Sequence, residues 1–528
     1  MMTKFTTLEE VANLIDDETV VGVGGFCGFG APDSVLRAIG KRYESTSHPK
    51  NITVITPAAA GTGQKDNWGI NALGTKGLID TVITSVIMLP KTVLEAINRN
   101  EIACYSPPLG YFGHMFRTLA GKEPGYITHV GLNTYCDPRL DGCAMNDKAK
   151  AKNLRIVELA SIYNKEYLFY PTIKMDYALL RGTYADTDGN ISCDHEAIHP
   201  EILEMATAVH NNGGKVIFQV EKIVKKGSID PRNVIVHKSE IDYVVIANPK
   251  EHLQSYAIGE FMPELTGEIK VKDFETPAYN LSAKKVISRR ACMEIMEDAL
   301  VNLGLGISEG ISYVAREEDV LSKFTLSIET GILGGMTLSG GMVGAGINAD
   351  AYYKMADTFD LYNGGGLDQC FLSAAEIDEE GNVNVSKFSK LVNGPGGFIN
   401  ITQNTKKVYF SNIFTASKTE IKIEDGEVKI IKDSDTLKFV KKVEQVSFSG
   451  KDAIKDGKEV MYITERGVFK LTKDGLMLIE IAPGVDLEKD ILAKMEFKPL
   501  ISDDLKVMDE KLFREEKMNL VLKKKEEK

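Results

Sequence analysis

The stretches VVGVGGFCGFGAPDSVLRAIGKRY (residues 20 to 43) and LVNLGLGISEGISYVAREE (residues 300 to 318) follow the same plan. Each begins with a short apolar segment typical of a buried strand, passes through a glycine-rich turn and ends in an amphipathic helical pattern. In the first stretch, Pro32 suits the first turn of the helix, where its missing N–H would have no partner. The repeated unit of strand, turn and helix predicts two α/β domains of related design.

Other patterns extend this prediction along the chain. The segments ALLRGTYADTDGNIS (178 to 192) and CFLSAAEIDEEGNVNVS (370 to 386) both read as an apolar strand, an acidic turn with Gly-Asn and a second strand. Solid apolar runs indicate strands buried on both faces, as in mainly parallel sheets; they are KVIFQV (215 to 220), YVVIA (243 to 247) and TVITSVIML (81 to 89). We therefore expect two open α/β domains with largely parallel sheets, residues 1–280 and 281–528, with the boundary in the weakly patterned stretch 275 to 285.

Composition excludes several classes of protein. The chain has 528 residues and a net charge of -12, so no basic face is expected for a nucleic acid. No apolar run reaches the ~18 residues that cross a bilayer. The start MMTKFTTLEE lacks a signal-peptide pattern, so we expect a cytoplasmic protein without a membrane partner. The seven cysteines are scattered without any CxxC spacing, which favours reduced thiols over disulfides or a zinc ribbon.

Two short motifs suggest chemistry that their setting argues against. HEAIH (195 to 199) matches the HExxH string of zinc proteases, but Pro200 pushes His199 out of the helical conformation that such a site needs. GISEG (306 to 310) matches the GxSxG nucleophile elbow, in which the catalytic histidine follows the serine. All eight histidines of this chain precede residue 253. We therefore predict neither a metal site nor a Ser308 triad.

A third motif, SIETGILGG (327 to 335), places Glu329 between an apolar strand pattern and a glycine-rich turn. A glutamate before Thr-Gly is most often a solvated turn residue. However, a carboxylate with an ordinary pKa near ~4.3 is ionised at neutral pH and needs no general base to act as a nucleophile. A thioester is activated enough for such an attack, and glycine N–H groups can stabilise the oxyanion that forms. The resulting acyl anhydride would keep the energy of the thioester.

The chain resembles the family I coenzyme A transferases, and most closely their acetate or propionate CoA-transferase branch, in which both halves are fused. The family's strand-end Glu-x-Gly-x-x-Gly-Gly string is matched by Glu329, Gly331, Gly334 and Gly335. The resemblance covers nearly the whole chain and includes GLNTYCDPR (131 to 139), LLRGTYADTDGNI (179 to 191), FDLYNGGGLD (359 to 368) and GGFINITQNTKKVYF (396 to 410).

This resemblance implies a ping-pong transfer of coenzyme A from a short-chain acyl-CoA to a short-chain carboxylic acid. Glu329 would carry a glutamyl-CoA thioester, with no metal and no permanently bound cofactor. By resemblance, Asn348 should contact coenzyme A, and Gly396 and Gly397 should bring backbone amides near the reacting carbonyl. The alternative for Asn348 is a helix cap before ADAYYKMAD. The family also implies a homo-oligomer, a dimer or a tetramer.

One loop departs from the family. In SPPLGYFGHMFR (106 to 117), Leu109 stands before Gly110 where the family usually has glutamine. Leu109 and Gly110 are therefore expected to line an altered acid pocket that accepts apolar short acids such as butyrate. Two alternatives stay open. One is an acyl-CoA hydrolase, in which water reaches the intermediate. The other is a non-catalytic protein that binds acyl-CoA.

Overall fold

The computed structural model of the chain describes residues 3–272, 279–416 and 418–525. Within these ranges, no helix is both long and apolar enough to span a bilayer. Part of the expected boundary stretch, residues 275–278, lies outside the described ranges, as do the first two residues of MMTKFTTLEE. The division into residues 1–280 and 281–528 therefore stays a prediction.

The first half of the chain is built around a ten-stranded sheet. Along its main path every neighbouring pair of strands is parallel. In spatial order these strands are β1 (Lys4–Phe5), β13 (Tyr243–Ile246), β11 (Lys215–Val224), β9 (Tyr177–Asp186), β2 (Val20–Val23), β3 (Ile52–Ile55), β4 (Ile79–Ile83) and β5 (Ala103–Tyr105). Two short strands, β10 (Ile191–Ser192) and β12 (Val234–Val236), extend it by antiparallel pairing. The central strands are covered on both faces, which explains their solid apolar sequences.

The second half holds another ten-stranded sheet, mixed but parallel at its centre. Strands β15, β14, β20, β25 and β28 run parallel, and antiparallel strands flank them. In spatial order the strands are β19 (Ala351–Tyr352), β16 (Ile332–Leu333), β15 (Thr325–Ser327), β14 (Leu300–Leu303), β20 (Gln369–Leu372), β25 (Lys407–Ser411), β28 (Glu459–Ile463), β29 (Gly467–Thr472), β30 (Gly475–Ile481) and β31 (Leu500–Val507). The expected fold class, two α/β domains with largely parallel sheets, is confirmed.

Helices and small sheets complete both halves. The first half has α1 (Leu8–Leu14), α2 (Asp33–Thr46), α3 (Lys91–Asn98), α4 (Gly110–Ala120), α5 (Asp147–Lys152) and α6 (Ile202–Asn211). The second has α7 (Ala283–Cys292), α8 (Gly310–Glu317), α9 (Met355–Asn363), α10 (Phe398–Asn404) and α11 (Gly450–Lys455). A small sheet of β6 (Gly125–Thr128), β8 (Lys165–Pro171) and β7 (Glu158–Ile162) stands on the first half, and the hairpins include β17–β18 (Met336–Thr337, Gly346–Ile347) and β26–β27 (Glu420–Glu424, Glu427–Lys432).

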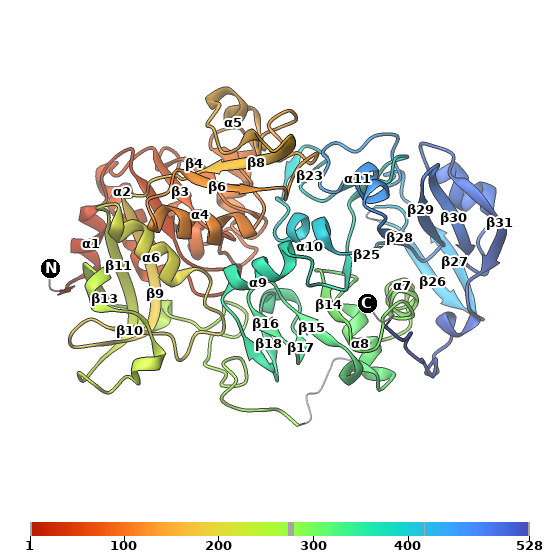
Figure 1. The fold of residues 1–528 in the computed structure, drawn as a ribbon. Coiled ribbons are helices and arrows are strands. Elements are labelled where there is room, and N and C mark those ends of the chain that lie inside the picture. Colours follow the sequence, from red (N-terminus) through yellow and green to blue (C-terminus); the bar gives the residue numbers. More distant parts are fainter. Residues whose placement is uncertain (1–2, 273–278, 417, 526–528) are drawn as a thin grey trace.

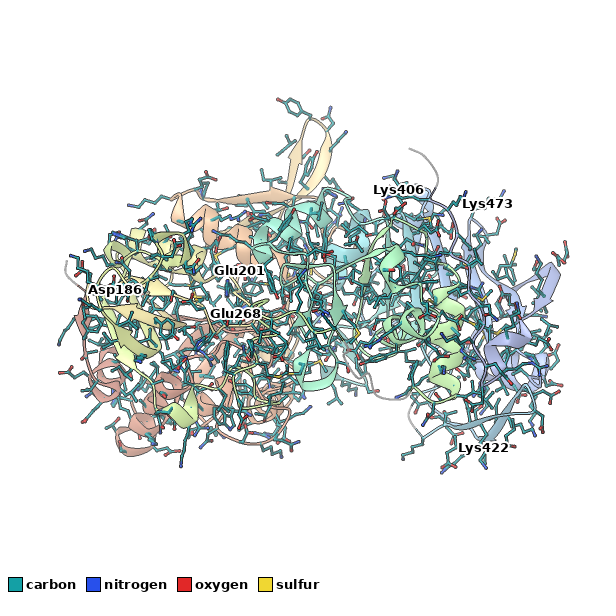
Figure 2. The ribbon with its side chains drawn as sticks, turned by 90° about the horizontal axis from the view of Figure 1, so that it is seen from below. Asp186, Glu201, Glu268, Lys406, Lys422 and Lys473 are labelled. Carbon is teal, nitrogen blue, oxygen red and sulfur yellow. The ribbon has the colours of Figure 1, made fainter. Side chains whose placement is uncertain are left out.

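The two halves lie side by side, with α9 and α10 in the middle of the molecule (Figure 1). One cluster of buried apolar side chains runs through both halves, from Val11 to Met495. Contact between the halves is close at α4, since a Cβ atom on Gly113 would lie 2.7 Å from the Cβ of Ala356. Glu201, labelled in Figure 2, lies at the same contact, because this Cβ atom would also lie 2.9 Å from one of its carboxylate oxygens. Burial raises the pKa of the Glu201 carboxyl well above its usual range. The two halves are therefore in direct contact at α4.

One predicted strand is shorter than its sequence suggested. The apolar run TVITSVIML was expected to be a strand throughout, but β4 ends at Ile83. Beyond this point the chain turns away, because the Thr84 hydroxyl donates to the Val86 carbonyl at 3.0 Å and the Ser85 hydroxyl donates to the Pro57 carbonyl at 2.5 Å. The residues that follow the strand form a loop that faces the second half.

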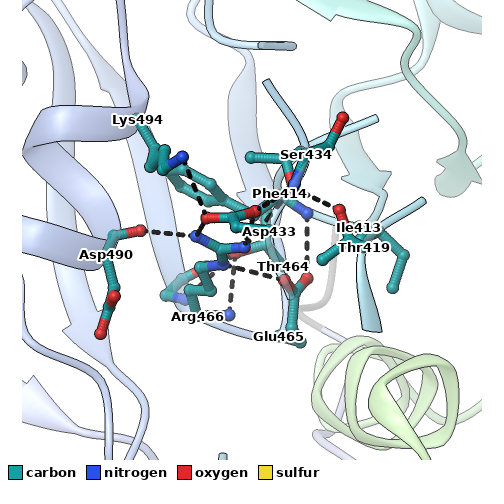
Figure 3. A network of polar contacts seen from close by, with 12 residues as sticks. Ile413, Phe414, Thr419, Asp433, Ser434, Thr464, Glu465, Arg466, Asp490 and Lys494 are labelled. Atoms are coloured by element: carbon teal, nitrogen blue, oxygen red, sulfur yellow. Dashed lines mark hydrogen bonds and ion pairs between the residues drawn. The ribbon is translucent and has the colours of Figure 1, made fainter. Parts of the chain in front are cut away.

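The buried guanidinium of Arg466 connects separate segments in the outer part of the second half (Figure 3). This group donates to both carboxylate oxygens of Asp433, at 2.7 and 2.9 Å, and to the Asp490 carbonyl at 2.8 Å. It also pairs with Glu465 at 3.2 Å and lies over the Phe414 ring. Buried charge is tolerated here because nearly all of its donors are paired. The network ties the segment after β27 to the turn between β28 and β29.

Candidate active site

Glu329 lies in a tight turn that follows β15. The Gly331 N–H donates to the Ile328 carbonyl at 3.0 Å, and the Ile328 N–H donates to the Ile332 carbonyl at 2.9 Å. The turn stands beside β14, which has β15 on one side and β20 on the other. Ligands of open α/β sheets bind at such a switch point, outside the carboxyl ends of the strands. The expected strand end thus carries Glu329 to the place where the sheet topology favours a site.

The glycines of this motif let another segment of backbone pass closely. Gly331 has a φ of 114°, and a Cβ atom there would lie 1.9 Å from the Tyr353 carbonyl oxygen. At Gly334 it would lie 2.1 Å from a carboxylate oxygen of Asp350, and at Gly335 it would lie 2.1 Å from the Ile347 carbonyl oxygen. No other residue fits these positions without displacing the neighbouring segment. The motif therefore fixes the turn that presents Glu329.

The carboxyl group of Glu329 faces the loop before α10. One of its oxygens lies 3.5 Å from the position that a Cβ atom on Gly397 would occupy. Within the described part of the chain, no acceptor pairs with the Gly397 N–H. The side chain is partly buried, and this burial raises the pKa of the carboxyl above its usual range, although Asn302 partly counteracts the shift. A partly dehydrated carboxylate beside a free N–H donor is suited to attack on a carbonyl group.

The loop that carries Gly397 is held by the first half. The Gly396 N–H donates to the Ser85 carbonyl at 3.0 Å, and the Leu109 N–H donates to the Gly396 carbonyl at 2.9 Å. A Cβ atom on Gly394 would lie 2.3 Å from the same Ser85 carbonyl oxygen. Gly396 was expected to present its amide to the substrate, but in this structure that amide joins the two halves. Of the two expected glycine donors, Gly397 alone has its N–H unengaged here.

Leu109 and Gly110 lie at the start of α4, against the second half. Leu109 is fully buried, and the Gly110 N–H donates to the side-chain oxygen of Asn400 at 3.1 Å. A Cβ atom on Gly110 would lie 2.9 Å from the Phe359 ring. Gly110 also borders a small cavity of about 10 Å³. The structure thus brings Leu109, Gly110 and Gly396 together, although little open space surrounds Leu109.

A second loop of the first half, residues 24 to 30, also reaches the site. A Cβ atom on Gly344 would lie 2.7 Å from the Phe26 ring and 3.2 Å from the Thr330 side chain. Burial, and then the negative charge of Glu329, raises the pKa of the Cys27 thiol to about 12. Elements from both halves therefore surround the turn that carries Glu329.

The side-chain amide of Asn348 is hydrogen-bonded within the protein. Its side-chain oxygen accepts the Val271 N–H at 2.8 Å, and its side-chain nitrogen donates to the Val271 carbonyl at 2.8 Å. The helix-cap alternative is wrong, because α9 begins only at Met355. Asn348 instead lies between β18 and β19, with its amide engaged by the segment that leaves the first half.

Sequence reasoning missed two residues beside Glu329. Asn302 in β14 is buried and donates to the Ser327 carbonyl at 3.0 Å. The Tyr362 hydroxyl lies 2.6 Å from the Ser327 hydroxyl, two residues before Glu329. An asparagine inside the apolar strand pattern VNL was the available signal for the first. No local pattern distinguished the tyrosine, because its role depends on packing of α9 against β15.

The HEAIH and GISEG motifs each lie in a loop that leads into a helix. Residues 195–199 form a loop between β10 and α6, so the helix that an HExxH site needs is missing there. Within that loop Glu196 pairs with the buried Arg181 at 2.9 Å. No cluster of three or more metal-ligating side chains occurs among the residues that the structure describes. Ser308 is fully buried at the start of α8.

Known proteins match nearly the whole of this chain in sequence and in fold. A coenzyme A transferase family profile matches residues 5–247. Acetate CoA-transferase YdiF of Escherichia coli strain K12 is 39% identical over 97% of this chain and 96% of the relative, and caffeate CoA-transferase of Acetobacterium woodii is 41% identical over 97% and 98%. A crystal structure of the Escherichia coli O157:H7 acyl-CoA transferase YdiF, in a thioester complex with CoA, has a similar fold. Its TM-score is 0.93, its sequence is 36% identical, and the match covers 99% of this chain and 98% of that one.

We expect Gly397→Ala to slow the attack of Glu329 on an acyl-CoA at least ten-fold. Gly397 has a negative φ, so alanine fits the backbone, but its methyl group would contact the Glu329 carboxyl. The matched control is Gly396→Ala, whose φ of 53° costs about 1 to 2 kcal/mol of strain while the methyl group meets no atom within 4 Å. Single-turnover rates of both variants report the effect on the attack of Glu329, and their melting temperatures report the backbone strain. A slower Gly396→Ala than Gly397→Ala would contradict the assignment of Gly397.

Proposed function

The chain belongs to the coenzyme A transferase family, and we propose that Glu329 is the nucleophile that carries coenzyme A during transfer. The observation that supports this proposal is the turn after β15, which places the Glu329 carboxyl against Gly397. A glutamate in this setting needs no general base. Asn302 and Gly397 are the neighbouring groups able to donate hydrogen bonds to charge that develops there.

The proposed reaction has two halves that mirror each other. A carboxylate oxygen of Glu329 attacks the thioester carbonyl carbon, and the C–S bond breaks to release CoA thiolate and leave a glutamyl acyl anhydride. The thiolate then attacks the glutamyl carbonyl carbon and expels the first carboxylic acid as its carboxylate. A second carboxylate reverses these steps, so an acyl-CoA is formed again and Glu329 is freed. No proton has to be moved at any step.

We propose that the Gly397 N–H stabilises the oxyanion in these steps, and that Gly396 acts by holding the loop. One well-placed backbone donor in a partly dehydrated site contributes about 3 to 4 kcal/mol to such a barrier. Contact of Asn348 with coenzyme A stays a prediction. Such a contact would have to replace its two hydrogen bonds to Val271 or use the backbone around it.

For the carboxylic acids, we propose short chains such as acetate, propionate or butyrate. Leu109 replaces the polar residue of the family with an apolar side chain, and the cavity beside Gly110 is small. The Leu109 side chain offers no hydrogen-bond partner, so it favours an acid that has no hydroxyl group at this position.

We further propose that the protein is a cytoplasmic homo-oligomer, a dimer or a tetramer, and that it uses coenzyme A thioesters as substrates without a permanently bound cofactor. Family resemblance supports the oligomer, and the reaction above supports the absence of a cofactor because every bond change occurs between substrate and Glu329.

We expect incubation with acetyl-CoA to give a CoA adduct on the wild-type protein, seen by intact mass, and borohydride to reduce it to an alcohol at residue 329. Glu329→Gln should give neither product. Glu309→Gln is the matched control, because burial also raises the pKa of Glu309, to about 7, in the loop after β14. An adduct that survives in Glu329→Gln would exclude the assigned nucleophile. Acyl-CoA binding without an adduct would favour a binding protein, and acid-independent loss of acyl-CoA would favour a hydrolase.

We expect the acid side of the pH profile for adduct formation to lie above the ordinary pKa of a glutamate. Burial raises the pKa of Glu329, and only the carboxylate attacks, so the rate falls as pH decreases through that raised pKa. Asn302 lowers the same pKa, so Asn302→Leu should move the acid limb to higher pH. Stopped-flow measurements from pH 4 to 9 would show this, and an unchanged limb in Asn302→Leu would count against the arrangement.

Transfer rates from acetyl-CoA to propionate, butyrate and lactate test the proposed acid pocket. We expect butyrate and propionate to exceed lactate at least ten-fold in kcat/KM, since leucine at position 109 offers the lactate hydroxyl no hydrogen-bond partner where the family has a polar side chain. Leu109→Gln should narrow this difference by restoring a polar group. A clear preference of the wild-type enzyme for lactate would refute the proposal for the pocket while leaving coenzyme A transfer intact.

A further inference from the structure

Helix α4 begins at the site without a cap from its own sequence. The residue before its first turn is Leu109, and no described side chain of the first half accepts a hydrogen bond there. The first N–H groups of a helix have no partner inside the helix, and burying them unpaired costs free energy. Both Leu109 and Gly110 are fully enclosed, so water is not the partner of these N–H groups.

The second half supplies the missing acceptors. The Leu109 N–H donates to the Gly396 carbonyl at 2.9 Å, and the Gly110 N–H donates to the side-chain oxygen of Asn400 at 3.1 Å. Asparagine is among the best helix caps when it lies just before a helix. Asn400 performs the same task from another helix, α10, three residues after Gly397. It is 2% exposed, so its hydrogen bonds form in a dry environment.

The nitrogen of the same amide points towards α9. It donates to the side-chain oxygen of Asn363 at 3.0 Å. The residue before Asn363 is Tyr362, whose hydroxyl lies 2.6 Å from that of Ser327 at the end of β15. One amide therefore connects the start of α4 to the helix that supports the Glu329 turn. A shorter or apolar side chain at position 400 cannot make both bonds.

The contact leaves little freedom for adjustment. A Cβ atom on Gly110 would lie 2.6 Å from the Asn400 nitrogen, so the start of α4 rests directly on this amide. Loss of the bond would let Leu109 and Gly396 shift relative to Gly397. Displacements of about 1 Å in a site can reduce rates by two orders of magnitude.

We propose that Asn400 is a positioning residue, which caps α4 from the second half and thereby sets the distance between the Leu109 loop and Glu329. The inference rests on the proposed nucleophilic role of Glu329. Among the described residues, the Asn400 side chain forms its hydrogen bonds with Gly110 and Asn363 and not with Glu329. It acts through Gly110 and Gly396, so its loss should affect the rate of acyl transfer more than the affinity for coenzyme A.

The test compares Asn400→Leu with Asn400→Asp. Leucine removes both hydrogen bonds at similar volume, whereas aspartate keeps the acceptor for the Gly110 N–H. We expect Asn400→Leu to slow formation of the CoA adduct from acetyl-CoA at least ten-fold, with the dissociation constant for free CoA within two-fold of wild type. Asn400→Asp should stay within three-fold of the wild-type rate.

A control separates positioning from general loosening of the contact between halves. Asn98 accepts the Val392 N–H at 3.1 Å, which is another hydrogen bond between the halves, away from α4. Asn98→Leu should lower the melting temperature about as much as Asn400→Leu but leave the adduct rate within two-fold of wild type. An adduct rate in Asn98→Leu as low as in Asn400→Leu would overturn the proposal.

Two further results would overturn it. One is a wild-type rate in Asn400→Leu. The other is an Asn400→Asp rate ten-fold or more below wild type, and this result is decisive even if the leucine variant does not fold. Absence of an adduct on the wild-type protein would instead refute the role of Glu329, so failure of the proposed function and failure of this inference give different results.

Discussion

The site depends on a short contact between two backbones. The Gly396 N–H meets the Ser85 carbonyl and the Leu109 N–H meets the Gly396 carbonyl, so a loop of the second half is held on both sides by the first. Ser85 and Leu109 are buried, where an unpaired backbone group would cost about 1 to 3 kcal/mol. They decide where Gly397 lies, and Gly397 lies against the carboxyl group of Glu329. Neither half contains this arrangement alone.

The second requirement is a strained turn that only glycine allows. Gly331 combines a φ of 114° with a contact that excludes any side chain, so Glu329 is presented on a backbone with no alternative course. The carboxyl group is partly buried there, which raises its pKa and makes the ion less stable than in water. A less stabilised carboxylate is a more reactive one, provided that donors await the oxyanion.

The sequence predicted the local features of the fold and of the site. The glycine pattern around Glu329, the strand–turn–helix units and the buried strands all follow from neighbouring residues, and the structure contains them. Contacts between distant segments were not predictable. The use of the Gly396 amide to join the halves, the pairing of Asn348 with Val271 and the cap that Asn400 gives to α4 each unite residues that no sequence period connects. The run TVITSVIML was predicted as one strand because most of its residues are apolar. The hydrogen bonds of the Thr84 and Ser85 hydroxyls, which end the strand, could not be predicted from this pattern.

The central claim is that Glu329 and Gly397 act on the same carbonyl group. A crystal structure of the wild-type protein after reaction with acetyl-CoA tests this most directly. We predict a bond between the Glu329 carboxyl carbon and the sulfur of coenzyme A, with the remaining carbonyl oxygen about 3 Å from the Gly397 nitrogen, and with the Gly396 bonds to Ser85 and Leu109 intact. A thioester on another residue, or a Glu329 thioester whose oxygen faces away from Gly397, would contradict the account.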